Sequence, residues 1–408
     1  MTKRKSPILL LSYTFPPWPD VGGRRWAKFA KQLSRRGHPI QVIAATPFPG
    51  SASPWDADVE SIPVRHFPRR YPACLFVTRP TFWGKASFKV ASAVLKLMAR
   101  GSVYDRALFW ESFISKGIDA AMRKDGIRNI IATGAPFRIP YYAAKAKARF
   151  PQLNLISDIR DPWTWEPRYR KYPLPPSRAR REAEMQRFVM EQANHILVPV
   201  EPMARFLKTE YPLLAKKIRV IPHGYDVDEI APRPKTASER VRLVFYGNLY
   251  DDIQEAIEGL VEAFSRHKDR FFLEIFSDSK KYARIFEAAG VSSMFRYEPP
   301  LPARQLFERL SQYDYVLVIQ PDRLKDNLST RYYEIVYSRT PILLISNPGV
   351  AFDFVTSNRL GLACRPHEVG ALLSSLAQRE VALDFNRSFD VSAYSFEKLT
   401  DVVESLLV

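Results

Sequence analysis

Residues 8–45 read ILLLSYTFPPWPDVGGRRWAKFAKQLSRRGHPIQVIAA and set the architecture of the first part of the chain. The apolar run at 8–11 predicts a strand, and a loop rich in proline and glycine follows it. Apolar residues then recur at helical spacing, at Trp26, Phe29, Ala30 and Leu33. Gly37 is expected to end this helix, and a second apolar run occupies 40–45. Strand, loop, helix and strand in this order open a parallel α/β domain.

The alternation of strands and helices continues along the chain and restarts once. In the first part, strands are predicted at 130–132, 155–156, 195–198 and 219–221, and helices at 141–150 and 178–192. After a polar break at 225–240, strands are predicted at 241–246, 271–276, 315–318 and 342–345, and helices at 254–265, 306–310 and 330–337. We therefore predict an α/β fold of two Rossmann-like doubly wound domains, 1–228 and 229–392, facing across a cleft.

The positive charge is concentrated in the first half of the chain. The net charge is +18, and residues 1–230 hold 39 Lys and Arg against 19 Asp and Glu. Such a field attracts a polyanion, so nucleic acid, an anionic membrane surface and a phosphorylated lipid are open as partners, beside a simple gain in solubility. The two cysteines suggest neither a disulfide framework nor a metal site. No apolar stretch approaches the roughly 20 residues of a spanning helix, and we expect a cytoplasmic protein that is not integral to a membrane.

Two segments have the chemistry of a phosphate or nucleotide site. Gly22 and Gly23 directly precede the first helix, where backbone N–H groups can approach a phosphate closely. The alternative is a plain tight turn, and the pattern is not the GxGxxG of dinucleotide-binding domains.

The second segment is 326–334, DNLSTRYYE. Ser329 or Thr330 would cap a helix, Arg331 offers a forked cation for a diphosphate, and Glu334 can accept both hydroxyls of a ribose. Asp326 can accept hydrogen bonds from sugar hydroxyls. The alternative is a capped surface helix with an exposed salt bridge.

Taken in order along the chain, these motifs resemble glycosyltransferase family 4, retaining enzymes of the two-Rossmann-domain type. The resemblance rests on Pro16-Pro17, Gly22-Gly23, Arg36-Gly37-His38, VIPHGYD at 220–226, the acidic pair Asp326 and Glu334, and EIVYSRTPIL at 334–343. It implies that the second domain binds a nucleotide diphosphate sugar, with Gly247 and Asn248 in the donor site, and that the first domain binds the acceptor. It also implies that a final helix, within 393–408, crosses back to the first domain.

Residues 158–165, DIRDPWTW, follow a predicted strand and resemble the family's His-Asp step near the reacting carbon of the sugar. The resemblance implies that Asp161 holds a donor hydroxyl or stabilises oxocarbenium charge, and that Arg160 contacts a phosphate. The alternative is an Arg–Asp ion pair that holds the loop in place.

One departure from the family concerns the start of the second domain. The family carries an Arg and a Lys after the first strand there, whereas residues 246–252, YGNLYDD, contain no cation. Stabilisation of the leaving group is a large catalytic effect, so Arg331, Arg160 or Arg24 would have to replace these cations.

Residues 76–100 have the pattern of a basic amphipathic helix. Four cations fall on one helical stripe, Lys85, Lys89, Lys96 and Arg100, and an apolar line is formed by Phe88, Ala91, Leu95 and Met98. With Phe82 and Trp83 in front, such a helix can lie in a membrane interface. An ordinary domain helix with a solvated basic face has the same pattern.

The resemblance and the residues together predict a retaining glycosyltransferase whose acceptor is a lipid-linked or membrane-proximal glycan. An anionic membrane is the expected partner, nucleic acid is not, and neither a metal nor a cofactor is expected. Two alternatives stay open: a catalytically silent nucleotide-sugar-binding protein of the same fold, and a nucleic-acid-binding α/β protein.

Overall fold

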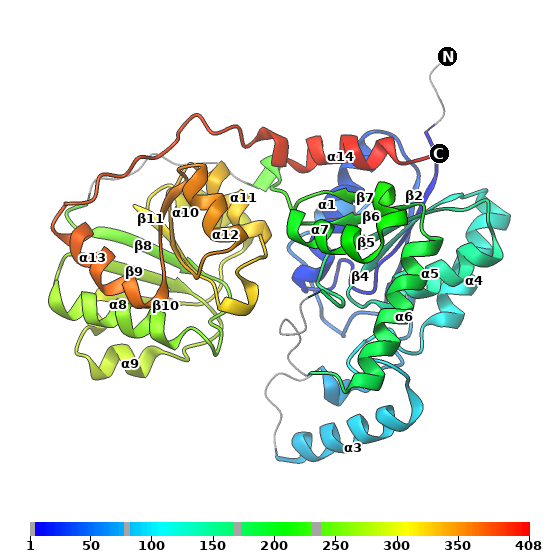
Figure 1. Cartoon of the computed structure of the whole chain (residues 1–408), viewed down its shortest axis with the longest axis horizontal. Helices are drawn as coiled ribbons and strands as arrows, with labels where there is room; N and C mark the ends of the chain where they lie inside the picture. Colours follow the sequence, from blue (N-terminus) through cyan, green and yellow to red (C-terminus); the bar gives the residue numbers. More distant parts are fainter. Residues whose placement is uncertain (1–4, 77–81, 166–172, 230–237) are drawn as a thin grey trace. The chain divides into compact units, whose positions relative to one another are not determined.

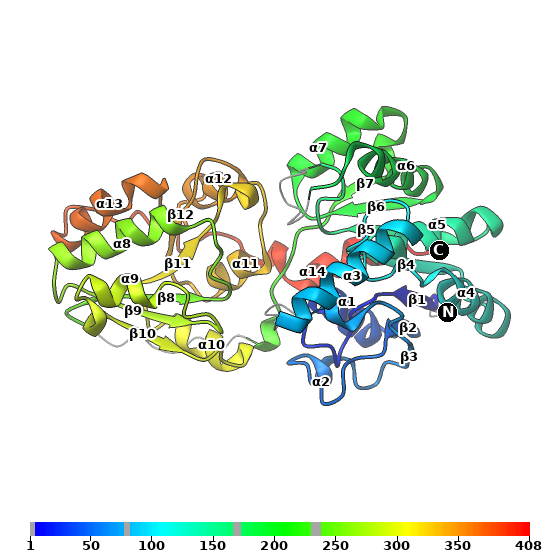
Figure 2. The ribbon, with the colours of Figure 1, turned by 90° about the horizontal axis from the view of Figure 1, so that it is seen from below.

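The computed structural model describes residues 5–76, 82–165, 173–229 and 238–408. The chain forms two compact units: unit 1 comprises 1–222 together with 396–408, and unit 2 comprises 223–395. Figures 1 and 2 show the two units in two views, and each unit is described by itself.

Unit 1 is built on a parallel sheet that has seven strands among the described residues, in the order β3-β2-β1-β4-β5-β6-β7. The strands are β1 (Ile8–Leu11), β2 (Ile40–Ala45), β3 (Val64–Phe67), β4 (Asn129–Gly134), β5 (Asn154–Ile159), β6 (His195–Val198) and β7 (Ile218–Val220). The helices are α1 (Arg24–Arg35), α2 (Asp56–Val59), α3 (Phe82–Met98), α4 (Glu111–Asp125), α5 (Arg138–Arg149), α6 (Pro176–Gln192), α7 (Glu201–Glu210) and α14 (Phe396–Ser405). The order of the first six strands is that of a Rossmann fold.

The opening segment folds as its pattern predicts. All four residues of β1 are buried, as expected for a central parallel strand covered by helices on both faces. Trp26, Phe29 and Leu33 of α1 enter the core of unit 1. After α1, Gly37 has φ +86°, a backbone conformation that glycine adopts without strain, and the chain turns into β2.

Helix α14 completes unit 1 from the far end of the chain. Phe396, Leu399 and Val403 belong to the same core as α1, and the Phe396 ring meets Phe29 edge-on at 5.1 Å. Figure 1 shows α14 (red) lying beside α1. Behind the helix, Asn154 donates a hydrogen bond to the Leu406 carbonyl at 2.8 Å.

The structure corrects the prediction for the apolar side of α3. Leu95 is buried in a small cluster with Tyr71, Val103 and Leu108, and Phe88 and Ala91 are half-buried on the same side. The predicted apolar line therefore faces the protein, because it covers this cluster. Met98, assigned to that line, is exposed. The predicted cationic stripe is also shorter, since α3 ends at Met98 and Arg100 lies beyond it.

Unit 2 repeats the order of the first six strands of unit 1. Its parallel sheet has six strands in the described part of the chain, in the order β10-β9-β8-β11-β12-β13. The strands are β8 (Val241–Tyr246), β9 (Phe271–Phe276), β10 (Phe295–Glu298), β11 (Tyr315–Ile319), β12 (Ile342–Ile345) and β13 (Gly361–Cys364). The helices are α8 (Gln254–Arg266), α9 (Ala283–Ala288), α10 (Ala303–Leu310), α11 (Thr330–Tyr337), α12 (Val350–Ser357) and α13 (Val369–Ala377).

The core of unit 2 forms between the sheet and its helices. Leu260 and Phe264 of α8 are fully buried, as is Leu243 of β8. Helix α13 packs directly beside α8, as Figure 2 shows. The two doubly wound parallel sheets confirm the predicted fold class. Among the described residues, no helix has the length and apolar character needed to cross a membrane.

Candidate active site

In unit 1, the loops after β1, β4 and β5 meet at the carboxyl edge of the sheet. The Asp20 Oδ1 atom accepts a hydrogen bond from the Gly22 N–H at 2.8 Å and holds the short turn before α1. A Cβ at Gly22 would lie 2.9 Å from the Arg160 Nη2 atom, and one at Gly23 would lie 3.1 Å from the Thr14 carbonyl oxygen. The glycine pair is therefore needed for close packing at this edge, and its contact with a phosphate stays a prediction.

Arg160 and Asp161 follow β5 directly and point into this loop cluster. The Arg160 Nη2 atom donates to the Ala135 carbonyl at 2.7 Å, and its Nε atom lies 3.4 Å from Asp161 Oδ2. The Ala135 N–H also lies 3.5 Å from that oxygen. The ion pair expected under the structural alternative is thus present. Arg160 is held by its neighbours, whereas 29% of the Asp161 side chain is exposed and can be reached by a ligand.

The loop that carries Asp161 is held in place by contacts of Trp163. The Trp163 ring stacks on Phe137, with the ring centroids 4.8 Å apart, and its Nε1–H donates to the buried Glu182 carboxylate at 2.6 Å. Beside Glu182 lies Asp105, whose pKa is raised to about 6 by burial. These contacts fix the position of Asp161, because the loop cannot shift without breaking the Trp163 hydrogen bond.

Asp158 is a buried anchor that the sequence analysis did not identify. Its Oδ2 atom accepts hydrogen bonds from the Trp26 Nε1–H at 2.6 Å and from the Thr133 hydroxyl at 3.1 Å. Arg25 pairs with the same carboxylate at 3.3 Å and donates to the Pro222 carbonyl at 2.8 Å. Asp158 therefore ties α1, β4 and β5 together. The sequence did contain a signal for this role: an aspartate that follows an apolar run is expected to be buried, and a buried carboxylate needs a charged or hydrogen-bonding partner.

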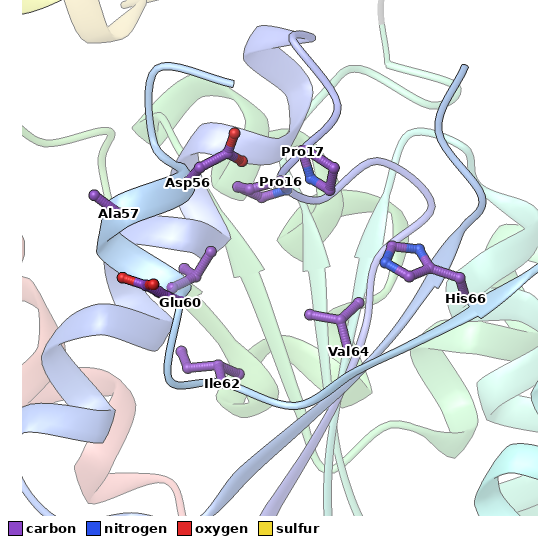
Figure 3. A pocket seen from close by; sticks show the side chains of 9 residues that line it. Pro16, Pro17, Asp56, Ala57, Glu60, Ile62, Val64 and His66 are labelled. Atoms are coloured by element: carbon purple, nitrogen blue, oxygen red, sulfur yellow. The ribbon is translucent and has the colours of Figure 1, made fainter. Parts of the chain in front are cut away.

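A pocket of about 500 Å³ lies on the same side of unit 1, between the loop after β1, helix α2 and strand β3. Figure 3 shows Pro16 and Pro17 beside Asp56, with Val64 and His66 on the strand below them. The pocket combines apolar walls with carboxylate and imidazole groups. From the sequence, the two prolines were identified only as a family motif, and the acidic and histidine groups of this pocket were not predicted.

In unit 2, the structure brings Arg331 to the end of β8. Gly247 has φ +105°, and a Cβ there would collide with the Arg331 guanidinium. The Arg331 Cζ atom lies 5.0 Å from the centroid of the Tyr246 ring and 5.6 Å from that of Phe245. Arg331 belongs to α11, but its guanidinium lies beside Gly247. It therefore brings a positive charge to the segment 246–252, which contains no Lys or Arg.

The other predicted donor residues lie around the start of α11. Ser329 is the exposed residue before the helix, and its side chain makes no capping hydrogen bond, while Thr330 is the first helical residue. Glu334 lies one turn further along and is buried. Gly247 and Asn248 are exposed at the end of β8.

Asp326 has a structural contact in addition to its predicted role. Its Oδ1 atom accepts a hydrogen bond from the Val350 N–H at 3.3 Å, at the start of α12. A Cβ at Gly349 would lie 2.9 Å from the same oxygen. Asp326 therefore caps α12. The structure thus groups Gly22 with Arg160 and Asp161, and Gly247 with Arg331, while Lys85, Lys89 and Lys96 lie on α3.

A sequence model of Glycosyltransferase Family 4 matches residues 129–229, from the first residue of β4 into the first residues of unit 2. No curated protein sequence matches the chain. Among solved structures, the chain is similar to sucrose-phosphate synthase from Thermosynechococcus elongatus (TM-score 0.65, 14% identity, 98% of each chain covered).

Two further solved structures share the fold. One is Anabaena Alr3699/HepE in complex with UDP, with a TM-score of 0.59 and 12% identity over 98% of this chain and 94% of that one. The other is WaaG, a glycosyltransferase involved in lipopolysaccharide biosynthesis, with a TM-score of 0.58 and 13% identity over 97% of this chain and 99% of that one. At this level of identity, these likenesses establish the fold.

Proposed function

We propose, from the family 4 match over residues 129–229 and the two-domain fold shared with solved glycosyltransferases, that this chain is a glycosyltransferase of that family. It would transfer a sugar from a nucleotide diphosphate sugar, with retention at the anomeric carbon. The proposed acceptor is a lipid-linked or membrane-proximal glycan, as in cell-surface polysaccharide assembly. The reaction would take place on the cytoplasmic side of a membrane.

The observation that supports donor chemistry best is the position of Arg331 against Gly247. A diphosphate leaving from the end of β8 needs a fixed cation, and stabilising such developing charge is commonly the largest single catalytic effect. The loop after β8 supplies none. Arg331 brings a planar guanidinium, held over two aromatic rings, to this place, and its forked donors suit a diphosphate.

The remaining roles follow from where the other side chains lie. In the donor site, Glu334 would accept the ribose hydroxyls, Asp326 would accept sugar hydroxyls with its second oxygen, and Ser329 and Thr330 would present the N–H groups at the start of α11. Gly247 and Asn248 would line this site. No divalent ion enters the proposal, because a guanidinium and backbone N–H groups can neutralise a diphosphate.

The residues of unit 1 would act on the sugar and the acceptor. Asp161, partly exposed and held at the carboxyl edge of the sheet, would stabilise the oxocarbenium charge, and Arg160 would keep that carboxylate in place. Gly22 and Gly23 would face the donor phosphates. The pocket of Figure 3 suits a glycan acceptor, because a sugar ring can pack on Pro17 and Val64 while its hydroxyls donate to Asp56.

The first test is a thermal-shift screen of the purified protein against nucleoside diphosphates and nucleotide sugars. A ligand at 100 times its dissociation constant stabilises the folded state by about 2.7 kcal/mol, which is several degrees for a unit of this size. We expect one nucleotide class to raise the melting temperature of the wild type, and to raise that of Glu334→Ala by a smaller amount. If no nucleotide or nucleotide sugar does so, the proposal is wrong.

The second test separates an enzyme from a silent binding protein, an alternative favoured by the lack of cations at 246–252. Hydrolysis of the sugar nucleotide that binds is measured for wild type, Arg331→Ala and Arg331→Lys. We expect slow hydrolysis by wild type, partial activity with lysine because the fork is lost, and roughly 100-fold less with alanine. Binding without any hydrolysis or transfer would favour the silent protein.

A further inference from the structure

Helix α3 presents a second apolar face, which no other described part of the chain covers. Only Ser92 and Leu95 of the helix are buried. On its outer side, the exposed fractions are 78% for Phe82, 80% for Trp83, 89% for Leu97 and 66% for Met98. Large apolar side chains exposed together in this way indicate an interaction surface.

The exposed apolar residues lie on one side of the helix. Trp83, Val90, Val94 and Leu97 are separated by seven, four and three residues, which places them on one face at 3.6 residues per turn. Lys85, Lys89 and Lys96 follow a similar spacing and form a row along one flank of that face. We call the apolar residues Phe82, Trp83, Val90, Val94, Leu97 and Met98 the outer face, and the three lysines the lysine row.

The outer face points away from the body of unit 1. The opposite side of α3 packs, through Leu95, on the small cluster with Tyr71, Val103 and Leu108. Figure 1 shows α3 (cyan) at the margin of unit 1, away from its sheet. Helix α3 therefore has one buried side, which packs on the protein through Leu95, and a second apolar side that is exposed to solvent.

We infer that α3 lies in the interface of an anionic membrane, with its outer face among the lipids and its lysine row against their headgroups. A basic helix with aromatic and aliphatic residues on the other face is suited to this position. The charge of the protein decides between a lipid surface and a second copy of the chain. Unit 1 contains 40 Lys and Arg against 19 Asp and Glu, and pairing two outer faces would bring two lysine rows together.

The inference rests on the proposed function in one respect: membrane binding would bring the protein to an acceptor that is carried by a lipid. The assay below contains no nucleotide. Loss of vesicle binding with intact nucleotide binding would overturn the inference alone, and the reverse result would overturn the proposed function alone.

The experiment is co-sedimentation of the full chain with vesicles of phosphatidylcholine, with or without phosphatidylglycerol, at low and high salt. We expect binding only to vesicles that contain phosphatidylglycerol, and release by salt because screening weakens the attraction. Two variants test the two parts of the surface: Lys85→Gln/Lys89→Gln/Lys96→Gln and Phe82→Gln/Trp83→Gln/Leu97→Gln/Met98→Gln. The lysine variant should weaken binding on the order of 100-fold, from three charges near the surface. The outer-face variant should weaken it by more than that, from four inserted side chains.

Each variant has a control in unit 1, matched in charge for the lysines and in exposure for the apolar residues. Lys116→Gln/Arg123→Gln/Lys124→Gln removes the same charge from exposed positions of α4, and Leu213→Gln removes a side chain that is 96% exposed. Both controls should bind vesicles nearly as wild type does. All the substituted side chains are exposed, so circular dichroism and melting temperature should be unchanged.

Fluorescence supplies an independent readout of insertion. The seven tryptophans all lie in described segments, and Trp83 is the one that is exposed. Anionic vesicles should shift its emission to shorter wavelength, and Trp83→Phe should abolish the shift while binding persists. The inference is overturned if wild type ignores anionic vesicles at low salt, if both α3 variants bind like their controls, or if the outer-face variant instead changes a dimer into a monomer in sedimentation.

Discussion

Gly247→Ala should test whether turnover depends on where the Arg331 guanidinium lies, because Arg331 itself is retained. The substitution leaves every charge in place but adds one methyl group where the guanidinium of Arg331 now lies. Because the methyl group and the guanidinium cannot share that space, Arg331 has to move away from the end of β8. If the leaving diphosphate is stabilised there, Gly247→Ala should resemble Arg331→Ala in turnover.

The size of the effect follows from two contributions. A residue with a Cβ at φ +105° costs about 1–2 kcal/mol of stability, which corresponds to a few degrees in melting temperature. Displacing a long, flexible side chain adds little to that. The cost in turnover is larger: removal of one donor that stabilises developing charge lowers kcat by roughly 100-fold, and we expect a loss between tenfold and that value.

Gly290→Ala is the matched control. Gly290 also lies in unit 2 with a positive φ, of +67°, but a Cβ there meets nothing within 4 Å. It should lose a similar amount of stability with no change in turnover. The assay is single-turnover transfer or hydrolysis of the sugar nucleotide, together with melting temperature, for both variants. If Gly247→Ala and Gly290→Ala are equally active, the location of Arg331 over Gly247 has no part in the mechanism.

Glu334→Ala should weaken nucleotide binding in calorimetry by roughly 1.5–3 kcal/mol for each charged hydrogen bond lost, and unchanged affinity in a folded variant would rule out the ribose contact. Asp161→Asn should lower turnover strongly while nucleotide still binds, whereas a fall in melting temperature alone would indicate a purely structural ion pair. Asp158→Asn should destabilise unit 1 by about 3–5 kcal/mol, because it leaves the buried Arg25 charge unpaired, and a chemical denaturation curve matching wild type would contradict that role. Hydrogen bonds, first from Lys5, lower the pKa of Glu404 to about 2, so its contribution to stability is present above about pH 4.5 and is lost towards pH 2; Glu404→Gln should flatten the pH dependence of the melting temperature in that range.

The central strands could be predicted from sequence because strands buried on both faces have nearly continuous apolar sequences. The strands at 40–45, 195–198, 241–246, 271–276 and 342–345 have the predicted bounds. Each lies inside its sheet, where both faces are covered and the sequence is a nearly continuous apolar run. The strands β3, β10 and β13 were not predicted. They are three of the four edge strands of the two sheets, the fourth being β7. In β3 and β10 the sequences VRHF and FRYE mix charged and apolar residues, so they lack the continuous apolar run of a central strand.

The candidate site was predictable where a motif or a spacing marked it, and not where it depends on contacts between distant segments. The doublet Gly22-Gly23 and the segment around Arg331 were found from the local pattern. The contact of Arg331 with Gly247 spans 84 residues of sequence, so spacing alone could only suggest it as one of three replacements. For α3, amphipathicity revealed one apolar side but could not show that a second lies outside, since both apolar sets have helical spacing.

The return of α14 to unit 1 has a consequence for the order in which the protein can be made. Unit 2 is one continuous stretch, 223–395, whereas unit 1 needs the last thirteen residues of the chain. During synthesis, the apolar residues of α1 that pack with Phe396 and Val403 therefore stay uncovered by α14 while the whole of unit 2 is translated. The unit whose synthesis begins first is the last to be completed, and a chain cut short before residue 396 would leave the ribosome with these residues of α1 uncovered.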